Sequence, residues 1–358
     1  MTETQVEETS ASEVQVSGPS VDAALNPKRS VAKVLSSSMR ELALLPAIAA
    51  IMIAGTAASP AFLTSGNLTT VLQFSAALGL LVVGESLILI FGELDLSLQS
   101  VYGLAPMAAA YLTVHPDGRL GIIGAGTDLP PAIGTLAAIG IGVLASLVMA
   151  VFVVKLGMNA FITGLGMLIL LAGIQQGIVN DNTIYGLPSS WQYIGSHTWI
   201  GMPVAAWIEI AVFLAVGVFM RYHRHGRALY AIGGNIEAAR AAGIKVDRVR
   251  MAVWLFAGAL AALAGVMTAG QVDAVTANQG ATPGIIFTVF AAAVIGGISL
   301  DGGKGRMFGA FTGVLLLSLV TNVLDLAQVS SFWIQAADGA IIVLVLLVTR
   351  AIGYFQKT

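Results

Sequence analysis

RYHRHGRALYAIGGNIEAARAAGIKVDRVR, residues 221–250, is a charged segment between two apolar stretches. It contains seven of the seventeen Lys and Arg residues, in a chain of which only 10% of the residues are charged. Within it, Asn235 suits the N-cap of a short helix, Glu237 its first turn, and Gly243 the left-handed position after its end. The segment therefore predicts a short capped helix over 235–242, in a polar connection between two long apolar helices.

The rest of the chain is too apolar for an ordinary soluble domain. Hydrophobic residues make up 57% of the 358 residues, against about 45–50% in soluble proteins. The apolar runs are roughly 18 to 24 residues long, enough to cross about 30 Å of hydrocarbon as helices. They are continuous and do not alternate with polar residues, which favours helices over the strands of a membrane barrel. The fold class predicted is an all-α polytopic membrane protein with about ten transmembrane helices.

The distribution of basic residues predicts the orientation of these helices. With the N-terminus inside, only Arg119 of the seventeen basic residues falls on the outer side, a strong positive-inside signal. Both termini and the 221–250 connection are then cytoplasmic, and Trp191, Tyr193 and Trp199 are expected at the outer interface. The predicted apolar segments lie near 42–59, 70–91, 98–114, 132–154, 158–179, 204–220, 250–270, 285–300, 307–325 and 332–349.

Three parts of the chain follow from this pattern. Residues 1–40 are polar and lack the features of a signal peptide, which predicts a disordered cytoplasmic tail. Residues 41–350 form the transmembrane domain, with the cytoplasmic connection 221–250 inside it, and 351–358 form a short cytoplasmic tail. A lipid bilayer is the expected environment.

Several classes of function find no support in the sequence. The chain has no cysteine, so it has neither disulfides nor thiol chemistry. The net charge of −2 gives no indication of nucleic-acid binding, and the four histidines fall in loops, so no metal site is predicted. Gly302–Arg306 lacks the spacing and the preceding strand of a phosphate-binding loop. We therefore expect no catalytic residue and no cofactor in this chain.

One short pattern occurs twice. Phe91–Ser97, FGELDLS, is similar to Ile295–Asp301, IGGISLD, and each follows an apolar segment and precedes another. This similarity suggests two structural repeats packed about a shared pathway, as in many transporters.

Three blocks of the sequence carry a family resemblance. They are GELDLSLQS at 92–100, GRALYAIGGN at 226–235 with its continuation to Ile244, and VIGGISL at 294–300 followed by GGKG. Together with a weaker match at 159–166, they resemble the permease subunit of ribose-type sugar ABC importers over roughly 65–350. The middle block is the most specific. Glu93 and Gln99 replace residues usual in the family, so the first block does not fix a substrate.

The resemblance implies partners that this chain would need. A cytoplasmic ABC ATPase subunit would bind ATP and Mg and would receive the helix at 235–242 as a coupling helix. A second permease subunit, identical or different, and an extracytoplasmic sugar-binding protein would complete the importer. Alanines keep the helix slim enough for a groove, and Glu237 and Arg240 suit ion pairs at its rim; a solvated connection is the alternative. The predicted coupling residues are Gly234, Asn235, Glu237, Ala238, Ala239, Arg240 and Gly243.

Polar residues in the apolar segments are candidates for the translocation path. A carboxylate in the membrane is costly unless it faces a polar cavity or a partner, and amides offer a sugar neutral donors and acceptors. A hydrogen bond between helices is the alternative for Glu85 and the amides, and Asp95 is better explained as a helix cap. The candidates are Gln73, Glu85, Glu93, Asp95, Asn159, Gln175 and Asn322.

The function predicted is import of a monosaccharide (a ribose-like pentose, a hexose or a polyol) by an ABC permease. An ABC permease for nucleosides or branched-chain amino acids is the nearest alternative. An ion-coupled secondary transporter would instead depend on a membrane acid such as Glu85, and a membrane scaffold or sensor would not transport at all.

Overall fold

The structure is a computed structural model that describes residues 44–116, 124–125, 130–281 and 284–330, with 332–334, 336–337, 339–340, 343 and 347 beyond them. These residues all belong to one compact unit, Glu41–Thr358. The predicted tails at 1–40 and 351–358, Arg119 and half of the tenth apolar segment lie outside the described residues. The division into tails and a transmembrane domain therefore stays a prediction.

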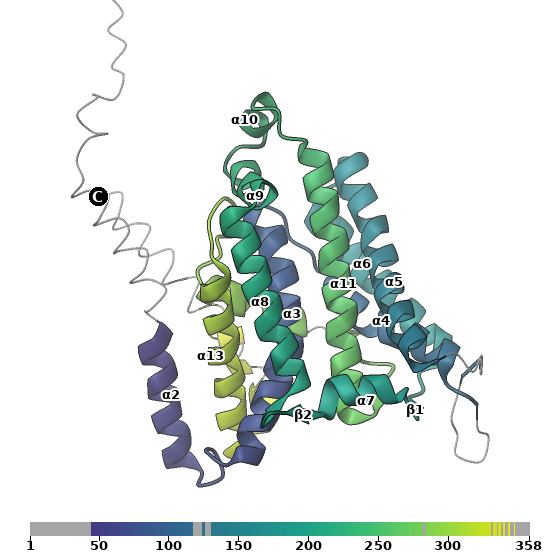
Figure 1. Cartoon of the computed structure of the whole chain (residues 1–358), viewed down its shortest axis with the longest axis vertical. Helices are drawn as coiled ribbons and strands as arrows, with labels where there is room; N and C mark the ends of the chain where they lie inside the picture. The colour runs from purple at the N-terminus through teal and green to yellow at the C-terminus, as the bar shows by residue number, and fades with distance from the viewer. Residues whose placement is uncertain are drawn as a thin grey trace, which may run out of the picture. The chain divides into compact units, whose positions relative to one another are not determined.

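Each predicted apolar segment except the tenth coincides with a helix (Figure 1). Among the described residues, six helices are long and apolar enough to cross a membrane, while α2 and α12 are shorter and α4 has sixteen residues. The prediction of a helical polytopic membrane protein is confirmed. Of the roughly ten predicted crossings, six correspond to helices of membrane length, and the others stay predictions. The helices are α2 Leu44–Ala58, α3 Ser65–Ile90, α4 Leu98–Thr113, α5 Pro131–Ala150 extended by η2 Val151–Lys155, α6 Ala160–Val179, α8 Val204–Tyr222, α11 Val246–Val272, α12 Ile285–Ile295 and α13 Met307–Leu326.

Several helix boundaries differ from the prediction because polar residues at the ends belong to the helices. Thr64 caps α3, so the helix begins at Ser65, well before the apolar run at 70. The helix α11 begins at Val246 and includes charged residues ahead of its apolar part. The helix α12 ends at Ile295, earlier than predicted, because Gly296 and Gly297 form a turn there.

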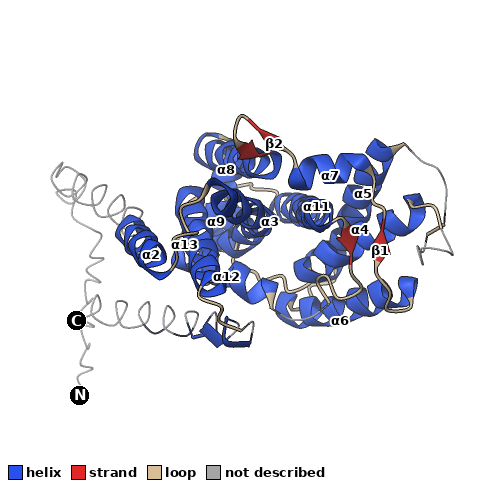
Figure 2. Ribbon diagram, turned by 90° about the horizontal axis from the view of Figure 1, so that it is seen from below, coloured by secondary structure: helices blue, strands red, loops and turns tan. Residues whose placement is uncertain are grey.

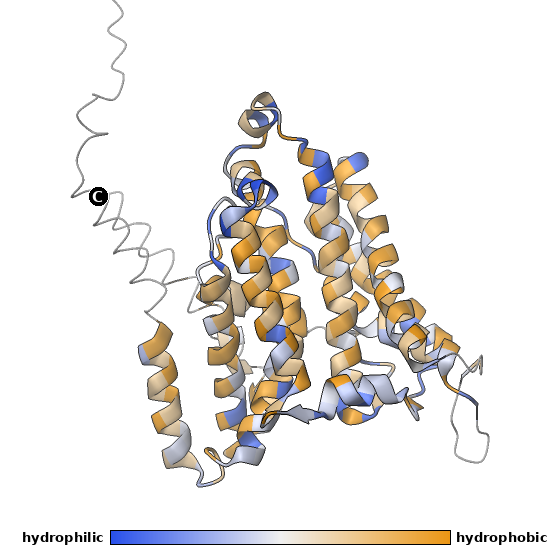
Figure 3. Ribbon diagram, in the orientation of Figure 1, coloured by the Kyte–Doolittle hydropathy of each residue, from blue (hydrophilic) through white to orange (hydrophobic). Residues whose placement is uncertain are grey.

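The helices α3 and α11 form the centre of the bundle. The helix α11 packs against α3, α4 and α5, and α3 also contacts α8, α12 and α13. Figure 2 shows α3 and α11 surrounded by the other helices. Figure 3 shows apolar residues along the length of the outer helices, as expected of surfaces that face lipid.

Short elements close the two ends of the bundle (Figure 1). At one end lie α7 Ser189–Ser196 and two strand pairs: β1 Ile184–Tyr185 with β4 Ala274–Val275, and β2 Thr198–Trp199 with β3 Met202–Pro203, both antiparallel. At the other end lie α9 Arg224–Gly234 and α10 Ile236–Ala241. Of the three aromatic residues predicted at the outer interface, Trp191 is 0% exposed and packs in a core cluster with Met107 and Val266, whereas Tyr193 and Trp199 are 53% and 59% exposed.

Candidate functional site

The predicted cytoplasmic helix exists as α10, and its caps are confirmed. The side chain of Asn235 accepts a hydrogen bond from the Ala238 backbone N–H at 2.9 Å, and Gly243 has the left-handed φ of +80°. Arg240 pairs with Glu237 at 3.2 Å and with Asp247 at 3.6 Å. The helix is therefore a defined element on the surface of the end that is predicted to be cytoplasmic.

The face that α10 presents differs in one residue from the prediction. Ala238, Ala241 and Ala242 are exposed, as a helix entering a groove requires. Ala239 is only 3% exposed and packs against the hydrophobic core, so it anchors the helix and does not face a partner. The reason is periodicity: residues on one turn of a short surface helix cannot all point outward.

Beneath α10, the helix α9 interlocks with two other segments of the chain. A Cβ atom on Gly233 would lie 1.9 Å from the Ile90 carbonyl oxygen at the end of α3, so only glycine fits. That oxygen accepts a hydrogen bond from the Gly303 N–H at 2.7 Å. The Tyr230 hydroxyl donates to the Gly305 carbonyl at 2.8 Å, and burial raises the pKa of this hydroxyl, which keeps it a neutral donor. The helix α9 is therefore in direct contact with the end of α3 and with the turn before α13.

The two segments with similar sequence form similar turns at this end. The N–H groups of Gly92 and Glu93 donate to Leu89 and Ile88, and those of Gly297 and Ile298 donate to Val294 and Ala293. Both Gly92 and Gly297 have positive φ, +93° and +87°. By these hydrogen bonds Gly92 corresponds to Gly297, whereas the sequence similarity aligns Gly92 with Gly296, one residue earlier. An ideal Cβ atom on Gly302 would lie 3.0 Å from the Gly92 Cα atom, so the two turns are neighbours.

A charged pair joins the first turn to α11. The guanidinium of Arg250 binds the Glu93 carboxylate, and it lies 5.9 Å from the centre of the Phe91 ring. Both side chains are largely buried, at 10% exposed for Arg250 and 18% for Glu93. Glu93 was predicted as a path residue, and the structure gives it a structural partner that the sequence did not indicate.

The buried acids within the bundle also have protein partners. The Asp95 N–H donates to Glu85 Oε1 at 3.1 Å, and Asp95 Oδ1 accepts from the N–H and the hydroxyl of Ser97 at 2.7 and 2.6 Å. Asp95 therefore forms a local turn with Ser97, which is the N-cap residue of α4, and does not make the helix-cap bond predicted for it. Glu85 was predicted either as a path residue or as a partner in a structural hydrogen bond, and one of its oxygens makes such a bond with Asp95. Neither Glu85 Oε2 nor Asp95 Oδ2 has a hydrogen-bond partner among the described residues.

The most unusual backbone lies at 276–281, which was predicted as an outer loop. Gln175 of α6 donates to the carbonyls of Thr276, Ala277 and Gln279, at 3.2, 3.0 and 2.6 Å. These amide contacts satisfy carbonyls that no helix or strand satisfies. The segment thus runs into the bundle along α4 as irregular backbone, which membrane proteins tolerate only inside the protein or beside a polar cavity.

Gln99 holds the other end of this segment. Its amide nitrogen donates to the Gly280 carbonyl at 3.1 Å, and its oxygen accepts from the N–H groups of Gly284 and Ile286 at 3.2 and 3.1 Å. Gln99 therefore caps the start of α12. The only sequence signal for this role was its departure from the family pattern. A helix interrupted inside the membrane is the feature that marks binding sites in many transporters.

The remaining path candidates are dispersed. Gln73 lies towards the outer end, 3.5 Å from the amide of Gln271. Asn159 is the N-cap of α6, and Asn322 exchanges two amide hydrogen bonds with Asn67, at 2.9 and 2.8 Å. Gln73, Asn159 and Asn322 thus lie on different helices, each with a hydrogen-bond partner of its own.

Comparisons with known proteins match most of the chain. A family described as branched-chain amino acid transport system / permease component matches residues 67–349. The ribose import permease protein of Escherichia coli (strain K12) is 32% identical over 296 residues, 81% of this chain and 87% of that protein. The autoinducer 2 import system permease protein of Klebsiella pneumoniae is 32% identical over 308 residues, 86% of each. The ribose import permease protein of Bacillus subtilis is 30% identical over 294 residues, 82% of this chain and 87% of that protein.

Proposed function

The chain belongs to the branched-chain amino acid transport system / permease component family, and from that premise we propose that it carries a ribose-like monosaccharide or polyol across the cytoplasmic membrane. Within that family it is a permease of the importer group that includes the ribose and autoinducer 2 import permeases. It is thus a non-catalytic, multi-pass subunit of an ATP-driven importer. The ion-coupled carrier is set aside, because the family consists of permease components.

The observation that carries the proposal is the connection from α10 into the bundle. The capped α10 stands on α9, and α9 is interlocked through Gly233 and Tyr230 with the end of α3 and the turn before α13. An ATPase subunit that binds α10 would therefore act on both turns at once. Glu93 and Arg250 extend the same linkage to α11.

The substrate proposal rests on two kinds of support. Two of the relatives are named as ribose permeases, and the third is named for autoinducer 2. Inside the bundle, the interrupted segment carries the amide of Gln279 and is bonded by those of Gln99 and Gln175, and neutral amides suit a hydroxylated, uncharged solute. Nucleosides and branched-chain amino acids remain the runner-up substrates.

Further parts of the proposal concern topology and partners. We expect ten crossings with both termini cytoplasmic, and two repeats related by the turns at 92–93 and 297–298. The partners are an ATPase subunit that binds ATP and Mg, a second permease subunit, and an extracytoplasmic sugar-binding protein. High affinity for the solute would lie in the binding protein, because passage through a permease requires release.

Uptake by the reconstituted importer tests the substrate and the energy source together. Proteoliposomes containing the permease, its ATPase and the binding protein are assayed with labelled ribose, a hexose, a nucleoside and a branched-chain amino acid. We expect ATP-dependent uptake of ribose or a related sugar. Uptake of the nucleoside alone would contradict the substrate, and uptake that needs no ATP would contradict the mechanism.

A bulky residue on the exposed face of α10 tests the coupling site. Ala238→Trp should abolish co-purification of the ATPase, because the indole would not fit a groove shaped for a slim helix. Ala132→Trp, also an exposed alanine but at the outer end of α5, is the matched control. Retained ATPase binding in Ala238→Trp would show that docking occurs elsewhere.

A further inference from the structure

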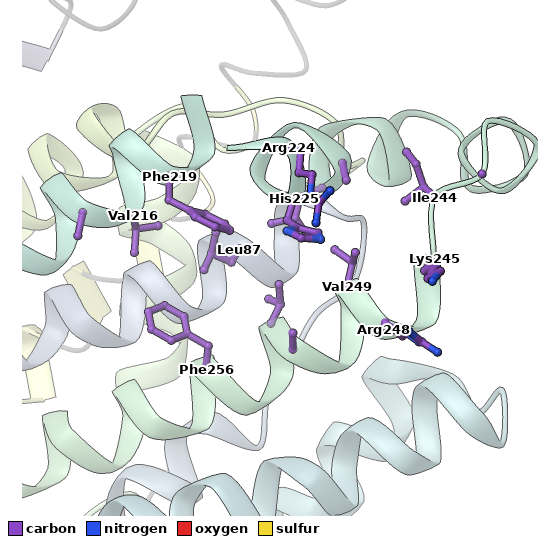
Figure 4. Close-up of a pocket in the computed structure, with 16 residues that line it drawn as sticks. Leu87, Val216, Phe219, Arg224, His225, Ile244, Lys245, Arg248, Val249 and Phe256 are labelled. Carbon is purple, nitrogen blue, oxygen red and sulfur yellow. The ribbon is translucent and has the colours of Figure 1, made fainter. Parts of the chain in front are cut away.

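A cavity of about 970 Å³ lies at the cytoplasmic end of the bundle, outside the coupling face of α10. It is formed between α8, α9 and the first half of α11, with Leu87 of α3 buried at its floor. Phe219 and Phe256 project from α8 and α11 into it and are 41% and 40% exposed, so the cavity opens to the outer surface of the bundle (Figure 4).

The cavity has two chemically different parts. Its inner walls are apolar, from Val216, Phe219, Phe256 and their neighbours on α8 and α11. Its cytoplasmic rim is basic, because Arg224, Lys245 and Arg248 lie there with His225 (Figure 4). The described residues that line it include no acidic side chain.

The basic residues of the rim are available to a ligand. Arg224, Lys245 and Arg248 are exposed and take no part in a salt bridge among the described residues. The nearby Asp247 pairs with Arg240 on the other side of the connection. Three cationic residues thus line a cavity that contains no counter-charge of its own.

The depth of the cavity matches one leaflet of a bilayer. From Val246, the first residue of α11, to Phe256 is ten residues, which is about 15 Å at 1.5 Å per residue. A hydrocarbon core of about 30 Å leaves about 15 Å for each leaflet. An acyl chain beside Phe219 and Phe256 would therefore place its headgroup at the level of the rim.

We propose that this cavity binds an anionic phospholipid of the cytoplasmic leaflet, with its phosphate on Arg224, Lys245 and Arg248 and an acyl chain between α8 and α11. Basic pockets between helices at the cytoplasmic side recognise such headgroups, and each Lys or Arg contributes about 1 kcal/mol. The bound lipid would bridge α9 and the connection Gly243–Lys245 that follows α10, and so support the platform under α10. The proposal requires that α9 and α10 lie on the cytoplasmic side of the membrane, and it does not depend on which solute is transported.

Native mass spectrometry of the permease purified with its ATPase tests this proposal. Dioleoylphosphatidylglycerol and dioleoylphosphatidylcholine are titrated separately, and the bound fraction is measured. We expect the wild type to retain phosphatidylglycerol in preference to phosphatidylcholine. In the variant Arg224→Gln/Lys245→Gln/Arg248→Gln, the affinity for phosphatidylglycerol should fall on the order of 10- to 100-fold. The control Lys155→Gln/Arg221→Gln/Arg227→Gln removes the same charge from the same side of the membrane, outside the cavity, and should bind like the wild type.

A second variant separates a lipid from a free anion. Ala252→Trp fills the apolar part and keeps every charge, so it should lose phosphatidylglycerol while eluting as the intact complex. Equal retention of phosphatidylcholine, or equal losses in both triple variants, would overturn the proposal. So would equal binding of glycerol 3-phosphate, which has the headgroup charge without chains, or lipid bound to the free permease but absent from the complex.

Discussion

Replacing Glu93 by Gln tests whether the charged pair holds the turn after α3 to α11. Breaking a fully buried ion pair by removing one partner costs about 3–5 kcal/mol, because the other charge remains buried without compensation. Here the side chains are 10% and 18% exposed, so we expect a lower cost, about 2–3 kcal/mol. Arg250→Gln should cost less, about 1–2 kcal/mol, since an unpaired carboxyl can take a proton and a guanidinium cannot lose one.

The double variant measures the interaction energy between the side chains of Glu93 and Arg250. In Glu93→Gln/Arg250→Gln no charge is left unpaired and the two amides can bond each other, so we expect about 0–1 kcal/mol of destabilisation. The coupling energy between the two positions is then roughly 2 kcal/mol or more, which is typical of residues in direct contact. The midpoint of thermal unfolding in detergent is measured by tryptophan fluorescence. We expect the midpoint of Glu93→Gln to be lower than that of the wild type by about 5 °C, and that of the double variant to be close to the wild type.

The exposed pair on α10 is the matched control. Glu237 and Arg240 are 75% and 50% exposed, so Glu237→Gln should cost at most about 0.5 kcal/mol. Losses of the same size at Glu93 and Glu237 would refute the reasoning. Additive effects of Glu93→Gln and Arg250→Gln would also refute it, because they would mean that the two side chains do not hold the segments together.

Three further predictions concern the interrupted segment and the cap of α10. Gly103→Ala would place a Cβ atom 1.6 Å from the Gln279 carbonyl oxygen, so we expect the free energy of unfolding to fall by at least about 1–3 kcal/mol. Gly173→Ala, with no atom within 4 Å of the new Cβ atom, should leave thermal unfolding unchanged. Gln175→Leu removes a donor from three carbonyls, of which that of Thr276 keeps the Gln279 N–H, and should speed hydrogen exchange across 276–281; unchanged exchange would mean that Gln175 does not hold the segment. Asn235→Ala should cost about 1 kcal/mol and speed exchange in α10 about fivefold, while Asn235→Asp should retain protection.

The sequence predicted those features whose cause is local. Apolar runs of membrane length located the helices, and the cap residues Asn235 and Gly243 located α10 within one residue at each end. Asp95 does have a local role, because its side chain forms a turn with Ser97, although it is not the cap of α4. The charge of the connections predicts that the end carrying α9 and α10 is cytoplasmic, and this orientation stays a prediction.

Features that depend on contacts across the chain were not predicted. Arg250 looked like one more cytoplasmic charge, and only the fold brings it to Glu93. Residues 271–283 looked like a neutral loop, because nothing in the local sequence shows that Gln99 and Gln175 supply hydrogen bonds to 276–284. Ala239 could not be separated from its exposed neighbours, since a helix of six residues has too few turns for its apolar pattern to reveal the buried face.

A single cysteine on α10 tests most directly whether an ATPase subunit drives this permease through that helix. The chain has no cysteine of its own, so Ala241→Cys provides one defined thiol at an exposed position. We predict that a membrane-impermeant maleimide labels Ala241→Cys in the free permease, and that assembly with the ATPase protects it. Ala132→Cys at the outer end should be labelled equally in both states. Undiminished labelling of Ala241→Cys in the active, assembled importer would contradict the account.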